Sequence, residues 1–165
     1  CIFHLGLLFI LSLPHSKQRS TCPPSAAVRQ AARSRRVLRC AAVSVLPSRP
    51  DANPLRDFLE SLARLEHCAP DTLVLPSHGR PFRGLHRRVE VLRSHHLQQL
   101  ESLRKACREP QTAYGLLPVM YGRPLRGYHR FLALGETVAH LNYLWHAGDL
   151  KRTVDDAGRI HFVAG

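Results

Sequence analysis

The sequence predicts a helix-rich α/β protein, and three patterns carry this prediction. Apolar residues recur every three or four positions over 54–65 and 85–107, as on the buried face of an amphipathic helix. Between these segments, the continuous apolar run 73–75 is typical of a short strand that is buried on both faces. Near the end of the chain, 150–154 and 159–163 flank a turn rich in Asp and Gly, which predicts a β-hairpin.

The first helix is predicted to begin at Pro54. Asn53 suits the N-cap position, because its side chain can accept a hydrogen bond from the first turn. Pro54 suits the first helical position, where the missing N–H costs nothing. Pro70 ends this helix, and the strand 71–75 leads into the polar loop 76–82, the kind of segment on which functional side chains are commonly placed.

The second helix has a stripe of residues that we expect to face the core. One of them, His96, is expected to be a hydrogen-bonded core or edge histidine rather than a ligand, the usual role of a histidine on such a stripe. Arginine and lysine residues lie largely outside the stripe. Its members are Leu85, Val89, Leu92, His96, Leu100, Leu103 and Cys107.

The C-terminal part of the chain has a different predicted architecture. Thr112 is expected to cap a short helix that runs through Met120 and is bent or shortened by an internal proline. A longer helix over 130–147 is expected to end at Gly148, since glycine readily adopts the left-handed conformation of a helix terminator. Helices followed by a hairpin resemble a winged helix, so 85–165 is predicted to be a helical, winged-helix-like domain.

Charge is distributed unevenly along the 165 residues, whose formal net charge is +12. Residues 1–50 hold eight of the 24 Lys and Arg and none of the 12 Asp and Glu. From residue 51 onward, basic and acidic residues are mixed as on an ordinary protein surface. The net charge therefore does not by itself indicate a nucleic-acid or anionic-membrane partner.

Residues 1–43 differ in character from the rest, and three interpretations remain open. The chain begins with Cys rather than Met, and its first stretch is rich in Ser, Ala, Pro and Arg. We expect either a disordered basic arm, an organelle transit segment, or a non-native leader from an incomplete or frame-shifted gene model. The apolar run 2–13 is too short to span a bilayer comfortably, so no membrane span is expected.

The five cysteines are odd in number and widely spaced, without a CxxC pair. This pattern argues against a disulfide framework and against a zinc ribbon. It fits a reducing compartment, so we expect the protein to be cytoplasmic, with organelle targeting by residues 1–43 still open.

Four segments, taken in order, resemble the C-terminal part of bacterial metallo-β-lactamase-fold hydrolases, a superfamily that includes glyoxalase II-like and lactonase-like enzymes. They are PDANPLRDFLESLARL, DTLVLPSHGRPFRGLHRRVEVLRSHH, TAYGLLPVMYG and LGETVAHLNYLWHAGDLKR. The resemblance implies that 44–84 is the C-terminal remnant of an αββα sandwich. It also implies that 85–165 is the winged-helix-like extension that helps to wall the pocket.

The same resemblance assigns a metal role to His78. It implies that the histidine of Ser77-His78-Gly79 is the last ligand of a site for two zinc ions, in an enzyme that hydrolyses ester, thioester or similar bonds of a small-molecule substrate. Zinc in hydrolases is held by histidines and carboxylates and leaves a position for water. A single histidine cannot form such a site.

The ligands that should accompany His78 are missing from this sequence. In the family that this sequence resembles, most of the metal ligands come from an HxHxDH motif, and none of the eleven histidines here lies in such a motif. Residues 1–43 could not supply the missing ligands, because they hold two histidines and no carboxylate. We therefore expect an inactive C-terminal hydrolase fragment that has no catalytic residue of its own and does not hold zinc by itself.

Two alternative functions remain open. A winged-helix-like tail and a basic arm suggest a nucleic-acid-binding module, but 136–147 offers only Asn142 and His140 and no Arg or Lys, so no specific nucleic acid is expected. A partner-binding module is the other alternative, because strand 73–75 and the apolar face of helix 54–65 would lack a covering layer. Such a face promotes self-association.

The remaining histidines and aromatic residues are expected to have surface or packing roles, as such residues usually do. These residues are His86, His95, His129, His140, His146, Tyr121, Tyr128 and Trp145.

Overall fold

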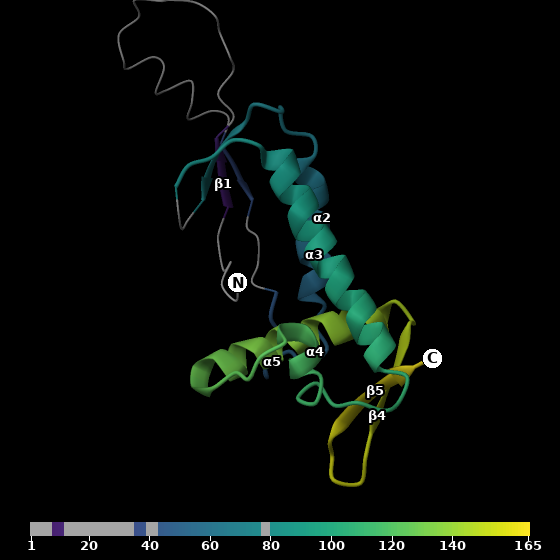
Figure 1. Cartoon of the computed structure of the whole chain (residues 1–165). Coiled ribbons are helices and arrows are strands. Elements are labelled where there is room, and N and C mark those ends of the chain that lie inside the picture. The colour runs from purple at the N-terminus through teal and green to yellow at the C-terminus, as the bar shows by residue number, and fades with distance from the viewer. Residues whose placement is uncertain (1–7, 12–34, 39–42, 77–79) are drawn as a thin grey trace, which may run out of the picture.

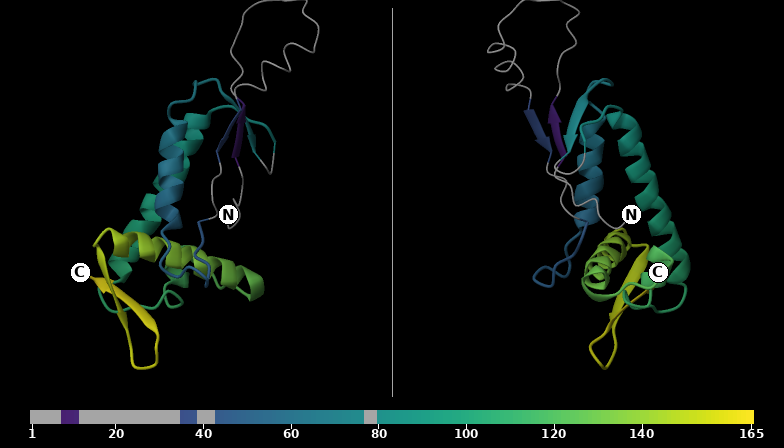
Figure 2. Two further views of the ribbon diagram at one scale, coloured as in Figure 1. Left: turned by 180° about the vertical axis from the view of Figure 1, so that it is seen from behind. Right: turned by 60° about the vertical axis from the view of Figure 1, so that its left-hand side comes forward.

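The computed structural model describes residues 8–11, 35–38, 43–76 and 80–165 of the chain. Helices α2 and α3 lie side by side, α5 crosses one end of this pair, and a hairpin packs beside the C-terminal end of α5 (Figures 1 and 2). This confirms the predicted helix-rich α/β class. In chain order the elements are β1 (Leu8–Leu11), β2 (Arg35–Leu38), α2 (Pro54–Leu65), β3 (Leu73–Pro76), α3 (Leu85–Ala106), α4 (Leu117–Tyr121), α5 (Gly127–His146), β4 (Leu150–Val154) and β5 (Ile160–Ala164).

Helix α2 begins where the local sequence signals predict. Asn53 is the N-cap, and its Oδ1 accepts a hydrogen bond from the backbone N–H of Arg56 at 3.2 Å. Pro54 occupies the first turn. The buried face of the helix consists of Leu55, Phe58, Ser61, Leu62 and Leu65.

Strand β3 is one of the two edge strands of a three-stranded antiparallel sheet with the order β2-β1-β3. Sequence reasoning predicted β3 but neither of the other two strands. Val74 is fully buried, whereas Leu73 and Leu75 are half-buried, so the expected burial on both faces is limited to the centre of the strand. On the side away from β1, the backbone of Val74 forms two hydrogen bonds with Phe82, at 2.8 and 3.0 Å.

One hydrophobic cluster joins α2, β3, α3, α5 and the hairpin. Its members lie on both sides of the domain boundary expected at residues 84 and 85, so α3 packs continuously against elements from both expected domains. Burial of this apolar surface is the main stabilising term available to the fold. The buried members are Leu55, Phe58, Leu62, Leu65, Val74, Leu85, Val89, Leu100, Leu103, Cys107, Leu116, Met120, Leu141, Leu144, Leu150 and Phe162.

The predicted start of the short helix at Thr112 is wrong, and local hydrogen bonding explains why. The Thr112 hydroxyl accepts from the N–H of Gly115 at 3.1 Å, and its carbonyl accepts from the N–H of Leu116 at 3.2 Å. Thr112 therefore closes a turn, a known alternative use of a threonine that could cap a helix. Helix α4 begins only at Leu117, and its proline lies in the first turn rather than in the interior.

The C-terminal elements agree more closely with the sequence. Helix α5 begins three residues earlier than expected, and Gly148 follows its end with φ 82°, as expected of a left-handed terminator. The hairpin pairs Arg152 with Phe162 and turns through Asp155, whose carbonyl accepts from the N–H of Gly158 at 2.8 Å. Within the described ranges, no helix has both the length and the apolar character needed to cross a membrane.

Gly135 allows residues 43–45 to lie directly against α5. The N–H of Val45 donates to the carbonyl of Gly135 at 3.0 Å. A Cβ atom at position 135 would lie 2.3 Å from the Ser44 Oγ and 3.1 Å from the Val45 carbonyl oxygen. An added Cβ would therefore force the Ser44 side chain to turn away and the Val45 carbonyl to shift by a few tenths of an ångström.

Gly135→Ala is accordingly expected to lower the free energy of unfolding by up to about 2 kcal/mol, because overpacking costs about 1–3 kcal/mol and alanine recovers about 1 kcal/mol of helix propensity. Urea denaturation followed by circular dichroism would measure it. Gly115→Ala is the matched control, because a Cβ at that position would have its closest neighbour at 3.4 Å, an ordinary contact. Equal losses for both variants would show that the close approach at Gly135 is not what matters.

Candidate functional site

The predicted metal ligand, His78, lies outside the described residues. Both described ends of its segment are fixed, however. Strand β3 ends at Pro76, and the two backbone hydrogen bonds between Val74 and Phe82 join the chain before and after the segment. The Arg83 guanidinium also donates to the carbonyl of Asp71. The expected ligand thus belongs to a segment that starts and ends on the edge of a sheet.

The described residues provide no metal centre by themselves. Among them, no group of three or more His, Cys, Asp and Glu side chains is arranged to hold a metal ion. Zinc in a hydrolase needs such a group, usually three protein ligands and a water molecule. The donor set of the described ranges therefore does not fit a zinc ion, and the role of His78 remains a prediction.

Two buried histidines form a pair between α3 and α5. The Nδ1 of His96 lies 3.0 Å from the Nε2 of His140, and the Nδ1 of His140 lies 2.8 Å from the carbonyl oxygen of Glu136. That oxygen can only accept, so His140 carries its proton on Nδ1 and accepts from His96 through Nε2. The ring of Phe58 packs edge-on against His96, with centroids 5.2 Å apart. The expected core role of His96 is confirmed.

Burial keeps both rings neutral. It lowers the pKa of His96 to about 3, with further contributions from His140 and His95, and it lowers the pKa of His140 to about 4. A buried imidazolium would lose its hydration without gaining a carboxylate partner. The pair is thus suited to holding α3 and α5 together near neutral pH rather than to exchanging protons in catalysis.

Tyr121 and Glu136 form a second polar pair, which sequence reasoning missed. The Tyr121 hydroxyl donates to the Glu136 Oε2 at 2.8 Å and so joins α4 to α5. Burial raises the pKa of Glu136, although the hydrogen bond from Tyr121 acts against this. Burial also raises the pKa of Tyr121, and the charge of Glu136 adds to the increase. No local sequence pattern joins these two residues, which are fifteen positions apart and lie on different helices.

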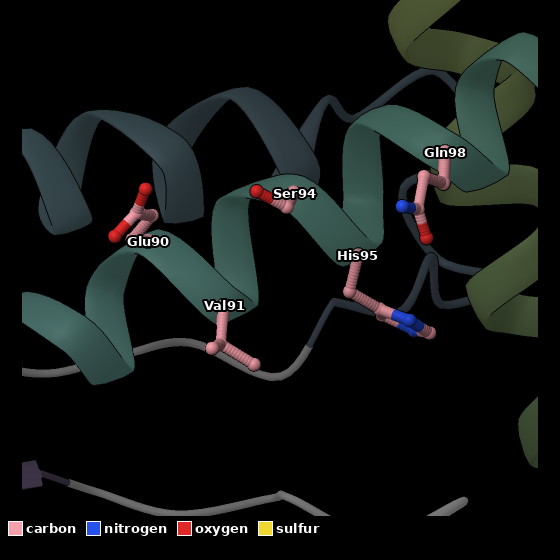
Figure 3. Close-up of a pocket in the computed structure, with 5 residues that line it drawn as sticks. All are labelled: Glu90, Val91, Ser94, His95 and Gln98. Carbon is pink, nitrogen blue, oxygen red and sulfur yellow. The ribbon is translucent and has the colours of Figure 1, made fainter.

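An open depression lies along one face of α3. Its described lining consists of side chains from this one helix, with His95 directed away from the helix axis (Figure 3). His95 also contacts the ring of His96, at a centroid separation of 5.5 Å. One carboxylate, one histidine and several neutral groups line the depression, but they do not point at a common position where a ligand atom could bind. The lining residues are Glu90, Val91, Ser94, His95 and Gln98.

Asn142 holds the segment that precedes α2. Its Nδ2 donates to the carbonyl oxygens of Pro50 at 2.8 Å and Ala52 at 2.9 Å, and the side chain is 1% exposed. His140 is likewise fully buried. The two polar residues that a recognition helix would have presented to a nucleic-acid groove are therefore both committed to the core.

Asp51 is held by two further side chains. His146 Nε2 lies 2.9 Å from its carbonyl oxygen, and Arg152 donates to its carboxylate at 2.5 Å. The Arg152 guanidinium also lies 3.8 Å above the ring of Trp145, a cation–π arrangement. Together with Asn142, these contacts attach three consecutive residues to the C-terminal elements. His146 and Trp145 thus have the packing roles expected of them.

Comparisons with known proteins agree with this fold. Residues 100–165 match the family described as metallo-beta-lactamase-like, C-terminal domain. A beta-lactamase domain protein from Burkholderia ambifaria is similar over 76% of this chain and 38% of its own, with 50% identity and a TM-score of 0.73. A metallo-beta-lactamase family protein from Thermus thermophilus is similar over 68% of this chain and 34% of its own, with 33% identity and a TM-score of 0.57. No curated protein matches the chain.

The chain therefore spans about a third of the length of each of these two structures. The two matches nevertheless extend over about seven tenths of the present chain, well beyond the residues of the C-terminal domain alone. The fold, the C-terminal domain match and the 50% identity agree, and they place this chain with the metallo-β-lactamase-fold proteins.

Proposed function

We propose that this chain forms the C-terminal part of a zinc-dependent hydrolase that acts on ester, thioester or similar bonds. The observation that carries the proposal is the 50% identity to a beta-lactamase domain protein over 76% of the chain. The sequence Ser77-His78-Gly79, placed directly after β3, supports a metal role for His78. Zinc, when bound in such an enzyme, activates a water molecule and polarises the substrate carbonyl.

The structural contribution of the described residues is to position this segment. Val74 and Phe82 join its two ends, and α3 continues from it into the core at Leu85 and Val89. The domains proposed on this basis are a leader at 1–43, a metallo-β-lactamase remnant at 44–84, and a helical extension at 85–165 that walls a pocket. The extension has helices α3 to α5 followed by a hairpin, which supports the winged-helix-like arrangement within this proposal.

Residues 1–165 are expected to bind zinc no more tightly than the same residues carrying His78→Ala. One imidazole supplies a single ligand, and a hydrolase zinc site requires three protein ligands. Titration of zinc against a chromophoric chelator would compare the two proteins. Tight, stoichiometric zinc that is lost on the substitution would refute the view that His78 is alone, because it would reveal companion ligands within the chain.

A chimera tests the ligand role itself. Residues 44–165 would replace the corresponding part of the Burkholderia ambifaria protein, with zinc content measured for parent and chimera. In the chimera, His78→Ala is expected to weaken zinc binding by more than about 10-fold, since even outer-shell partners of a metal ligand contribute about 10–100-fold. His67→Ala removes an exposed histidine and should leave zinc bound. Zinc loss in both variants, or in neither, would contradict the assignment of His78.

A further inference from the structure

A second surface, remote in sequence from His78, consists of the α4–α5 connection and the first turns of α5. Its sequence, GRPLRGYHRF over 122–131, contains three arginines, and the chain has no Asp or Glu between Glu109 and Glu136. Arg123, Arg126 and Arg130 are all exposed. Among the described residues, no ion pair involves any of the three. The surface therefore presents cationic groups without local neutralisation.

Two exposed aromatic rings lie among these arginines. Tyr128 is 70% exposed and Phe131 is 55% exposed. Their rings stack, with centroids 6.3 Å apart and planes inclined by 22°. They belong to the end of α5 that projects beyond the α2–α3 pair (Figure 1). Large exposed rings that adjoin one another are unusual on a surface without a binding role.

Arg130 organises this surface. Its Nε donates to the carbonyl oxygen of Leu125 at 2.9 Å, and its Nη1 donates to the Tyr114 hydroxyl at 3.3 Å. One guanidinium thus fixes the α4–α5 connection and the 112–115 turn against the start of α5. Tyr114, itself 58% exposed, lies at the edge of the same surface. Arg130 is therefore held in place on this surface before any ligand binds.

We propose that the surface formed by Arg123, Arg126, Tyr128, Arg130 and Phe131 binds single-stranded nucleic acid without sequence preference. Arginines that lack carboxylate partners attract phosphates and release their counterions. Exposed aromatic rings stack on unpaired bases, whatever the base, because every base presents a π face. The proposal goes beyond the hydrolase function and does not depend on zinc. It also differs from groove recognition, for which Asn142 and His140 are unavailable.

Other occupants fit the surface less well. A second copy of this chain would bring the same three arginines opposite one another, and the whole chain carries a net charge of +12. A duplex keeps its bases paired and stacked, so Tyr128 and Phe131 would have no base face to cover. An acidic protein would satisfy the arginines but not a stacking role for the rings. The experiment separates these cases.

The test measures binding of a fluorescein-labelled oligouridylate to the full chain by fluorescence anisotropy, over a series of salt concentrations. Tyr128→Ala combined with Phe131→Ala is expected to weaken binding about tenfold or more, since stacking on one base is worth a factor of this size. The salt dependence should stay unchanged, because no charge is removed. The control combines Val154→Ala and Ile160→Ala, exposed apolar residues on the hairpin, and should bind as the unmodified chain does.

A second part of the experiment tests the charges with a variant that combines Arg123→Gln and Arg126→Gln. The slope of log K against log salt should become shallower by about 1.4, or about 0.7 for each lost phosphate contact to a single strand. Arg87→Gln combined with Arg108→Gln removes the same charge from exposed positions elsewhere and should leave the slope unchanged. Every variant keeps the basic residues of 1–50, so any difference between two variants comes from the substituted residues.

Three results would overturn the proposal. The first is equal loss in the Arg87/Arg108 control, which would mean that net charge alone determines binding. The second is unchanged affinity after removal of both rings, which would mean that bases do not stack there. The third is equal binding of a duplex or of polyglutamate, which would assign the surface to general electrostatics or to an acidic protein. Circular dichroism of each variant would confirm that the fold is retained.

Discussion

Lowering the pH from 7 to 5 is expected to remove about 4 kcal/mol from the free energy of unfolding. In the unfolded chain, His96 and His140 titrate near the usual histidine value of about 6.5. In the folded chain, burial lowers the pKa of His96 to about 3 and that of His140 to about 4. Between pH 7 and pH 5 the unfolded state therefore binds more protons than the folded state, so the free energy of unfolding falls as the pH falls. At pH 5 the loss is about 2 kcal/mol for each histidine.

Two carboxyl groups also contribute to the pH dependence, in opposite directions. The raised pKa of Glu136 acts in the opposite direction, because the folded state then takes up a proton more readily than the unfolded state as the pH approaches the ordinary carboxyl range. The hydrogen bonds from Arg159 and His161 lower the pKa of Asp155, so its stabilising contribution is lost only in still more acidic solution. A loss of about 4 kcal/mol is a large part of the 5–15 kcal/mol typical of a folded domain.

Urea unfolding at a series of pH values would measure the effect. His140→Gln should be less stable at pH 7, because it breaks the hydrogen bond to His96, but its stability should vary less between pH 7 and pH 5. His67→Gln removes an exposed histidine and should keep the full pH dependence of the unmodified chain. If the unmodified chain had the same urea midpoint at pH 7 and pH 5, the buried neutral pair would be excluded.

Local signals made much of this fold predictable. The start of α2 depends on Asn53 and Pro54, adjacent residues whose roles involve only the first helical turn. The hairpin likewise depends on the turn through Asp155 and Gly158. Each of these features is decided within a few residues, so a single sequence suffices to predict it.

Features that depend on distant residues were not predictable in the same way. The pairing of β1 between β2 and β3 joins segments that are far apart in the chain, and no pattern within β3 specifies its partners. His96 was correctly assigned to the core from its helical spacing, but its partner, His140, lies 44 residues away. The early start of α5 also escaped prediction, because its first turn presents exposed Tyr128 instead of an apolar stripe.

The same distinction applies to the candidate sites. His78 was identified from the resemblance of its loop to that of metal-dependent hydrolases, and its role remains a prediction because it lies outside the described residues. The Tyr121–Glu136 pair and the contacts of Asn142 depend on side chains that only the fold brings together. Composition did not predict the aromatic–arginine surface either, since burial alone distinguishes an exposed Tyr128 from a packed one.

Asn142→Asp is expected to lower the free energy of unfolding by about 3–5 kcal/mol at pH 7. The substitution keeps the shape of the side chain but removes both N–H donors and places a carboxylate against the carbonyl oxygens of Pro50 and Ala52. Position 142 is 1% exposed, so the new charge would be buried without a counter-charge, a situation with a cost of this size. Urea unfolding of the variant and the unmodified chain would measure the difference.

Asn53→Asp is the matched control, since the same chemical change there should have the opposite consequence. The Asn53 side chain accepts a hydrogen bond from the N–H of Arg56, and a carboxylate accepts equally well and favours a helix N-terminus. The buried carboxyl at position 142 should have a raised pKa, so its destabilising effect relative to the unmodified chain should shrink as the pH falls. Similar stability of the two variants at pH 7 would contradict both the role of the Asn142 donors and the expected cost of a buried carboxylate at position 142.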